Sequence, residues 1–310
     1  MADWNFPIAP ALARHLVRYT PVKPLKGSGP EHLYLAEEAA TRRLVVIKLL
    51  QEEPSTSPDL YSRRRQLLIR SGVTLSKLRH PNIIETYDFG ASPDGVFVVM
   101  EYMEGGSLEQ KLAAFGALGV PDVASMARGL AGALDYAHEE GLVHCDIRPD
   151  RVGFDAAGMC RLTGFAAARS PGATSMGGAV SLPGSLVYAA PEQLMGNIVA
   201  ATDQFSLAGV MYRALTGRRP FRATEVVALI RQILTETPEP PSRTRPGLPR
   251  AADAVFAKAL MRNPEDRFRD CSAFADALDD ALGTGGNGGL RSWVNAARAK
   301  AVRALSAIGG

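Results

Sequence analysis

The feature that most constrains the fold of this chain is a change of sequence pattern at Gly105-Gly106. Before this point, short runs rich in β-branched residues, such as 44–49 and 96–100, are separated by turn residues, which predicts strands. After it, Ala-rich segments such as 120–139 and 203–216 carry apolar residues at helical spacing. A β-rich part followed by a helical part predicts an α+β protein with two lobes.

The same patterns divide the chain into consecutive segments. Residues 1–20 are expected to form a leader, and 21–282 one folded domain with its lobe boundary near 103/104. The Gly-rich run 283–289 has the composition of a flexible linker. Residues 290–310 follow it and carry an apolar stripe with basic residues beside it, which predicts an amphipathic helix. The other expected elements are a strand at 83–89 and helices at 11–19, 60–78, 223–235, 251–262 and 271–282.

The composition is that of a soluble globular protein, with 46% apolar and 22% charged residues in a chain of 310. The net charge of +3 is too small to indicate a nucleic-acid partner. The first residues lack a signal-peptide pattern, and no apolar run reaches the length of a membrane span. The three cysteines have no metal-ligand spacing, so we expect free thiols, no metal site and a cytoplasmic location.

Seven short motifs occur in a fixed order along the chain. They are Val46-Ile47-Lys48, His80-Pro81-Asn82-Ile83, Met100-Glu101-Tyr102-Met103 with Gly105-Gly106-Ser107-Leu108, His144-Cys145-Asp146, Ala190-Pro191-Glu192, 203–207 with 215–221, and 263–268. In this order, residues 20–282 resemble the protein kinase family, specifically bacterial serine/threonine protein kinases. The resemblance implies the two-lobed kinase fold, with a small β-rich N-lobe and a larger helical C-lobe. It also implies that Arg267 pairs with Glu192.

The resemblance assigns roles to individual residues. Lys48 would hold the α- and β-phosphates of ATP, although a lysine at a strand end can also simply face solvent. Val46 and the hinge residues Glu101 and Met103 would contribute to the nucleotide pocket. In the helical lobe, Asp146 stands at the position of the catalytic base. Arg148 replaces a lysine that contacts the γ-phosphate.

The glycine loop of the family is altered in this chain. Gly27 and Gly29 provide two of the family's glycines, and the third position falls on Glu31 or His32. Pro30 removes an N–H donor, and Glu31 adds a negative charge where phosphates would approach. An ordinary β-turn explains the two glycines equally well.

Several charged groups that support phosphoryl transfer are absent. From Leu60 through Ile84 there is no Asp or Glu, and Ser71 falls where the family has the glutamate that pairs with the lysine. Arg151 and Gly164 replace the two protein ligands of magnesium, and Cys145 replaces the arginine that binds a phosphorylated activation segment. The activation segment, 166–189, carries hydroxyls at Thr174, Ser175, Ser181 and Ser185, and its composition is typical of a mobile loop.

These changes predict a pseudokinase, a regulatory or scaffolding module with little or no kinase activity. Two interpretations of Arg151 stay open. It could join Lys48 and Arg148 in binding ATP without magnesium, or it could form an ion pair with Asp146, Asp150 or Asp155 and block the pocket. The competing functional class is an enzyme, either a weak serine/threonine kinase acting through Asp146 and Lys48 or one with a different nucleotidyl chemistry.

Two basic segments could recruit partners. The expected helix around residues 63–79 carries six basic side chains and no acid, which fits either a solvated face or docking to an acidic protein. The segment 290–308 could pack on its own helical lobe, bind a partner groove, or lie on an anionic membrane, which would make the protein a membrane-apposed scaffold.

Overall fold

The computed structural model describes residues 10–25, 31–52, 56–92, 94–172 and 186–285. The chain forms two compact units. One runs up to Tyr102 and includes Gly164–Ala167, and the other begins at Met103 and contains the remaining segments. Gly27, Gly29, the four candidate phosphoacceptors of 174–185 and the expected helix at 290–310 lie outside the described residues.

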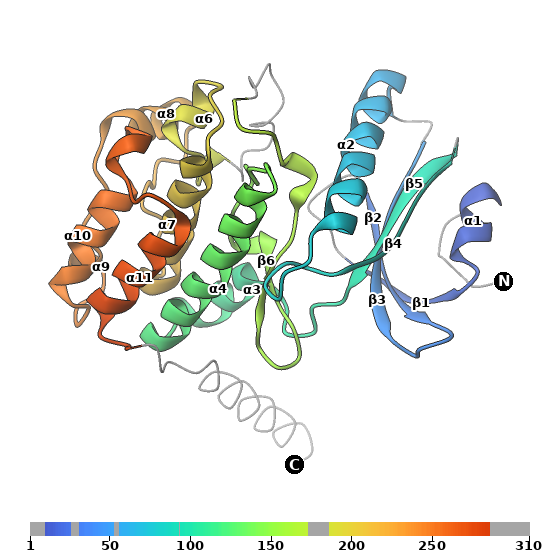
Figure 1. The fold of residues 1–310 in the computed structure, drawn as a ribbon, viewed down its shortest axis with the longest axis horizontal. Coiled ribbons are helices and arrows are strands. Elements are labelled where there is room, and N and C mark those ends of the chain that lie inside the picture. Colours follow the sequence, from blue (N-terminus) through green and yellow to red (C-terminus); the bar gives the residue numbers. More distant parts are fainter. Residues whose placement is uncertain (1–9, 26–30, 53–55, 93, 173–185, 286–310) are drawn as a thin grey trace, which may run out of the picture. The chain divides into compact units, whose positions relative to one another are not determined.

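The first unit is built on a five-stranded antiparallel sheet. Its strands are β1 (Tyr19–Leu25), β2 (His32–Glu38), β3 (Leu44–Gln51), β4 (Thr86–Ser92) and β5 (Gly95–Glu101), in the order β1-β2-β3-β5-β4. Helices α1 (Pro10–Leu16) and α2 (Pro58–Lys77) accompany this sheet (Figure 1).

The two faces of the sheet carry separate cores, because side chains alternate along β3. Ile47 packs with Leu12 and Leu16 of α1 in one cluster. Leu50 packs with Tyr61 and Leu68 of α2 in the other. Lys48 is two residues from Leu50, so it belongs to the face that α2 covers. On the solvent side of α2, basic residues such as Arg63 and Arg70 are exposed.

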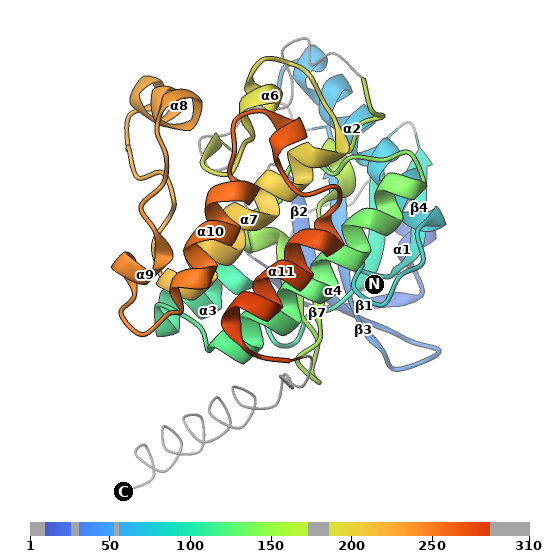
Figure 2. The ribbon, with the colours of Figure 1, turned by 60° about the vertical axis from the view of Figure 1, so that its left-hand side comes forward.

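The described part of the second unit is helical, apart from one short hairpin. Its elements are α3 (Leu108–Phe115), α4 (Val120–Glu139), η1 (Pro149–Arg151), the hairpin β6 (Val152–Phe154) and β7 (Cys160–Leu162), α6 (Pro191–Leu194), α7 (Ala200–Thr216), α8 (Val226–Thr235), α9 (Pro241–Thr244), α10 (Arg250–Ala259), η3 (Pro264–Asp266) and α11 (Cys271–Leu282). The short helix η2 (Phe165–Ala167) belongs to the first unit. Figure 2 shows α7 lying within the bundle, with α4, α10 and α11 around it.

Helix α7 is the core of this bundle and is buried along nearly its whole length, including the polar residues Asp203, Gln204 and Ser206. Buried polar side chains need hydrogen-bond partners. Gln204 bonds to the backbone of Phe268 in two directions, and Ser206 donates to the carbonyl of Tyr188. These side chains fix the loops that pass over α7.

Most of the predicted elements are present, and several expected boundaries differ by three residues. Helix α7 begins at Ala200 and not at 203, α8 begins at Val226 and not at 223, and α10 ends at Ala259 and not at 262. The helix expected at 11–19 ends at Leu16, and Tyr19 begins strand β1, opposite Glu38 of β2. The strand expected at 83–89 begins only at Thr86. Ile83 and Ile84 are buried next to a turn, in which the Asn82 N–H bonds to the His80 ring, and Ile83 forms only an isolated β-bridge before the strand begins. In the part of the chain that the structure describes, no helix combines the length and apolarity that a membrane crossing requires.

Candidate functional site

In the first unit, Lys48 is paired with a carboxylate from the segment that precedes β2. Its Nζ lies 3.4 Å from Oε1 of Glu31, and about a fifth of each side chain is exposed (23% and 18%). On α2, the position expected to hold the lysine's glutamate is Ser71, which is buried. The negative charge beside Lys48 therefore comes from Glu31 and not from α2. From the sequence, Glu31 was expected only to place a negative charge in the glycine loop, and its pairing with Lys48 was not predicted.

The other expected pocket residues of this unit lie at neighbouring positions of the sheet. Val46 is paired with Met100 of β5, and Glu101 with Val45. Glu101 also exchanges hydrogen bonds with the backbone of Glu85, through its own N–H and its carboxylate. Val46 and Lys48 lie on the same face of β3 because they are two residues apart.

In the second unit, Asp203 of α7 holds the loop that contains His144, Cys145 and Asp146. Its fully buried carboxylate accepts bonds from the N–H groups of His144 (2.7 Å) and Cys145 (2.9 Å), and lies 2.9 Å from His138 Nε2. Gln193 donates to the carbonyl of Cys145. Cys145 has a positive φ of 64°, an uncommon conformation for a residue with a side chain, and these bonds hold it there. Burial raises the pKa of its thiol strongly, so it is not a reactive thiolate.

His144 is a neutral structural residue of this loop. Its Nδ1 accepts the N–H of Asp146 (3.2 Å), and its Nε2 donates to the carbonyl of Thr163 (2.9 Å). These two bonds require one neutral tautomer. The ring is fully buried, and this burial lowers its pKa below the ordinary value.

This lowered pKa predicts that the contribution of His144 to stability declines as the pH falls below about 6.5, the pKa of an unfolded histidine. Below that pH the unfolded chain binds the proton before the native one does, so the free energy of unfolding decreases; at pH 7 and above the contribution of His144 is fully present. Denaturant unfolding at pH 7.5, 6.5 and 5.5 measures the slope. His144→Asn should flatten it, while exposed His15→Asn should leave it unchanged; an equal slope in all three proteins would contradict the assignment.

Asp146 lies between two arginines. Its Oδ2 accepts a hydrogen bond from Nε of Arg151 at 2.8 Å, and its Oδ1 lies 3.1 Å from Nε of Arg148. Arg148 also reaches Asp150 at 3.0 Å. Of the two interpretations of Arg151, the ion pair with Asp146 is therefore present in the structure. Both carboxylate oxygens of Asp146 therefore face guanidinium groups, at the place where a substrate hydroxyl would have to approach.

Arg148 is buried, and its hydrogen-bonding capacity is not used up. Its side chain forms ion pairs, but Nε and Nη2 have no hydrogen-bond partner among the described residues, because the contact with Asp146 lacks hydrogen-bond geometry. Oδ1 of Asp146 is likewise buried and has no hydrogen-bond partner among the described residues. Buried, unsatisfied guanidinium nitrogens are costly, and an oxyanion is the ligand that satisfies them best.

The residues present do not form the magnesium site of the family that this chain resembles. Arg151 offers a cation, and Gly164, with a φ of 91°, offers no side chain. The nearest carboxylates have other roles: Asp150 pairs with Arg148, and Asp155 accepts the N–H of Met159 and lies 3.5 Å from Arg161. Asp155 is thus a turn residue, as expected.

Met103 begins the second unit and is packed against the β6 hairpin. A side chain at Gly153 would lie 2.5 Å from Cγ of Met103, so only glycine allows this approach. The carbonyl of Met103 accepts the N–H of Gly106, which closes a turn before α3. The structure thus brings Asp146, Arg148 and Arg151 into contact in the second unit, to which Met103 also belongs. The other predicted pocket residues, Val46, Lys48 and Glu101, lie on the sheet of the first unit.

The predicted pairing of Arg267 with Glu192 is confirmed. The guanidinium makes two parallel bonds to the carboxylate, at 2.8 and 2.7 Å, and the arginine side chain is fully buried. This bidentate pair joins α6 to the segment that follows η3. It is the tertiary contact that the order of motifs predicted most specifically.

Comparison with known proteins agrees with this geometry. The protein kinase domain model matches residues 27–278. PknD, a serine/threonine-protein kinase of Mycobacterium tuberculosis, is 34% identical over 271 residues, which cover 86% of this chain and 40% of that protein. PrkC, a serine/threonine-protein kinase of Bacillus subtilis, is 31% identical over 253 residues, which cover 81% of this chain and 38% of that protein. The chain thus spans about two fifths of the length of these relatives.

Three parts of the family's architecture have counterparts here: a five-stranded sheet with a lysine on β3, a loop anchored by a buried aspartate, and a buried Arg–Glu pair. The matched region covers most of the chain. With its bacterial serine/threonine kinase relatives, this chain belongs to the protein kinase domain family.

Proposed function

We propose that this chain is a pseudokinase, a binding module of the kinase fold that regulates or scaffolds other proteins. The observation that carries the proposal is the state of Asp146, which is engaged on both oxygens by Arg148 and Arg151. A base must contact the hydroxyl of its substrate, and both oxygens of Asp146 already face guanidinium groups. Arg151 and Gly164 also stand where the family has its metal ligands, so the charge clamp on the phosphates is missing.

The ligand we propose for the module is ATP, bound without magnesium. This is supported by the buried Nη2 of Arg148, which lacks a hydrogen-bond partner among the described residues, and by the retention of Lys48 on β3. Each cation is at present opposed by a carboxylate, Asp146 or Asp150 in one unit and Glu31 in the other. A polyphosphate would replace those carboxylates as the partner of the basic groups.

A thermal-unfolding titration with ATP tests this proposal, first in EDTA and then in excess magnesium. The expected result is a rise of the unfolding midpoint that is as large in EDTA as in magnesium, because binding to the native state stabilises it. Arg148→Gln should reduce the rise, and Arg161→Gln, which removes an arginine paired with Asp155, should not. Absence of any shift under both conditions would exclude the nucleotide, and a shift that requires magnesium would exclude the metal-free mode.

The ion pair of Lys48 with Glu31 predicts a gain of affinity when the carboxylate is removed. Glu31→Gln should tighten ATP binding about two- to fivefold, since partly exposed ion pairs contribute roughly 0.4–1 kcal/mol. Calorimetric titration in EDTA measures the change. Glu37→Gln is the matched control, because Glu37 lies on β2 and pairs with Arg42 instead. Unchanged or weaker binding by Glu31→Gln would show that Glu31 does not compete for the lysine.

A second candidate function is a weak serine/threonine kinase. It is favoured by the intact anchoring of the loop through Asp203 and by the named activity of the relatives. Incubation with labelled ATP and manganese, beside Asp146→Ala, separates the two. Strong phosphate transfer that the substitution abolishes would establish the kinase.

For the pseudokinase, we propose that the exposed basic side of α2 and the segment 290–308 are where acidic partners or an anionic membrane would bind.

A further inference from the structure

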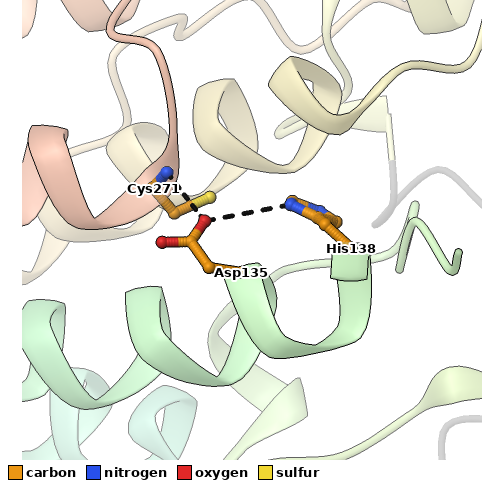
Figure 3. A group of neighbouring side chains, drawn as sticks. All are labelled: Asp135, His138 and Cys271. Atoms are coloured by element: carbon orange, nitrogen blue, oxygen red, sulfur yellow. Dashed lines mark hydrogen bonds and ion pairs between the residues drawn. The ribbon is translucent and has the colours of Figure 1, made fainter. Parts of the chain in front are cut away.

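A second cluster of chemically active side chains lies in the helical unit, where Asp135, His138 and Cys271 meet. Each offers one ligand atom, and these atoms all lie within 4.8 Å of one another. Figure 3 shows the Cys271 sulfur and the His138 ring both turned toward the Asp135 carboxylate. Asp135 and His138 are one helical turn apart at the end of α4, and Cys271 is the first residue of α11. Among the described residues, no other cluster of this kind is present.

The distances suit a small tetrahedral ion. Zinc binds nitrogen and oxygen at about 2.0–2.2 Å and sulfur at about 2.3 Å, so its ligand atoms lie roughly 3.3–3.8 Å from one another. His138 Nδ1 is 3.9 Å from Oδ1 of Asp135. Drawing the three atoms together around an ion therefore requires movements of only about 1 Å, within the reach of side-chain rotation.

Hydrogen bonds already orient two of the three ligands. His138 Nε2 lies 2.9 Å from Asp203, so a proton on Nε2 leaves the lone pair of Nδ1 facing Asp135 and Cys271. A carboxylate behind the histidine is the usual outer partner of a metal ligand. Oδ2 of Asp135 accepts the N–H and the hydroxyl of Ser272, while Oδ1 accepts only the N–H of Cys271 among the backbone groups. The Asp135 carboxylate also accepts the thiol hydrogen of Cys271, and the lone pair that does so becomes available to an ion when the thiol loses its proton.

The cluster is reachable from solvent. All three side chains line a pocket of about 470 Å³, whose wall also includes Glu139 and Gln204. Asp135 and His138 are partly exposed, whereas Cys271 is buried at the base. The pocket supplies an access route for an ion and room for a water molecule as fourth ligand.

We propose that Asp135, His138 and Cys271 form a binding site for a divalent transition-metal ion of the zinc class. One imidazole, one thiolate and one carboxylate are the donors that such an ion prefers, and magnesium, which prefers oxygen alone, is excluded by the sulfur. On binding, the Cys271 thiol releases its proton to solvent and coordinates as thiolate. The ion would join the end of α4 to the start of α11. Through His138 it would touch Asp203, which also holds the loop of Asp146.

The alternative is that the cluster serves structure alone. Asp135 would then only bind the first N–H groups of α11, and His138 would only pair with Asp203. In that case the Cys271 sulfur is a buried small side chain without a ligand role. The two accounts differ in one measurable respect, which is whether a metal–sulfur bond forms.

The test uses the full chain without an affinity tag. Zn²⁺ is titrated against a chromophoric chelator, and Co²⁺ binding is followed by its thiolate charge-transfer absorption. We expect one ion per chain and a cobalt–thiolate band. Cys271→Ala should abolish the band and weaken zinc binding roughly 10- to 100-fold. Cys160→Ala, which alters another buried cysteine outside the cluster, should match the wild type. No saturable zinc binding, or equal binding by Cys271→Ala, would overturn the site.

One measurement does not depend on the variant folding. X-ray absorption of the zinc-loaded wild type should show a single sulfur neighbour at about 2.3 Å beside nitrogen and oxygen neighbours. A zinc shell without sulfur would overturn the proposal even if zinc binds. His138→Gln and Asp135→Asn should each weaken binding, and if neither does, the ion is held elsewhere.

Discussion

Replacing Arg267 with methionine is expected to lower the free energy of unfolding of the helical unit by about 3–5 kcal/mol. The guanidinium makes two bonds to Glu192, and it also donates to the carbonyls of Met261 and Ala201. Its side chain has no solvent exposure. Removing it leaves the buried Glu192 carboxylate with the Thr202 hydroxyl as its one side-chain partner among the described residues, and an unpaired buried charge is strongly destabilising.

Thermal unfolding followed by circular dichroism measures this loss, with an expected fall of the midpoint of roughly 6–15 °C. Arg269→Met is the matched control. Arg269 is only two residues away and pairs with Asp270, but its side chain is 86% exposed. That control should change stability by less than about 0.5 kcal/mol. The double variant Arg267→Met with Glu192→Gln should lose less than the sum of the two single variants. A fall of under about 1 kcal/mol in Arg267→Met would contradict the assigned role.

The elements with strong local signals were predicted well from the sequence. Helices α4 and α11 begin and end as expected, because an apolar stripe and clear end signals, such as the Asp270 cap of α11, specify both. At Ile83 and Ile84, local sequence does not define where the strand begins. Two adjacent β-branched residues indicate a strand, but Ile83 forms only an isolated bridge beside the turn at His80, and the ladder begins at Thr86.

The candidate site was predictable in its positions and not in its partners. The order of motifs located Lys48, Asp146 and Arg151, but whether Arg151 faces a ligand or Asp146 depends on side-chain torsions that no spacing records. Glu31 is 17 residues from Lys48 in the sequence and approaches it only because β2 and β3 are paired. Cys271 is still further from Asp135, at 136 residues, so its meeting with His138 follows from the packing of α11 on α4.

Restoring the two missing ligands should make nucleotide binding depend on magnesium. We expect the double variant Arg151→Asn with Gly164→Asp to bind ATP at least about tenfold more tightly in magnesium than in EDTA, a difference of about 1.4 kcal/mol. The asparagine and aspartate oxygens are the ligands that hold magnesium in this family. Aspartate also tolerates the positive φ of 91° at residue 164 better than most residues with a side chain.

The same substitution also releases Asp146. Without Arg151, Oδ2 of Asp146 loses its bond at 2.8 Å and is open to a substrate hydroxyl, while Arg148 remains on Oδ1. Phosphate transfer should nevertheless stay low for two reasons. The α2 position that carries the lysine's glutamate in the family is Ser71, and Lys48 still forms its ion pair with Glu31. The double variant therefore separates metal binding from catalysis.

Calorimetric titration of wild type, each single variant and the double variant, in EDTA and in magnesium, measures the effect. Arg161→Asn is the control for loss of a nearby arginine, since Arg161 pairs with Asp155 and not with Asp146. Each single variant should gain less magnesium dependence than the pair, because an ion that keeps several waters is held through the combined set of ligands. If the double variant responds equally in both conditions, the substitutions at 151 and 164 are not what sets the metal requirement of this pocket. If Gly164→Asp alone gives the full effect, the role of Arg151 is confined to holding Asp146.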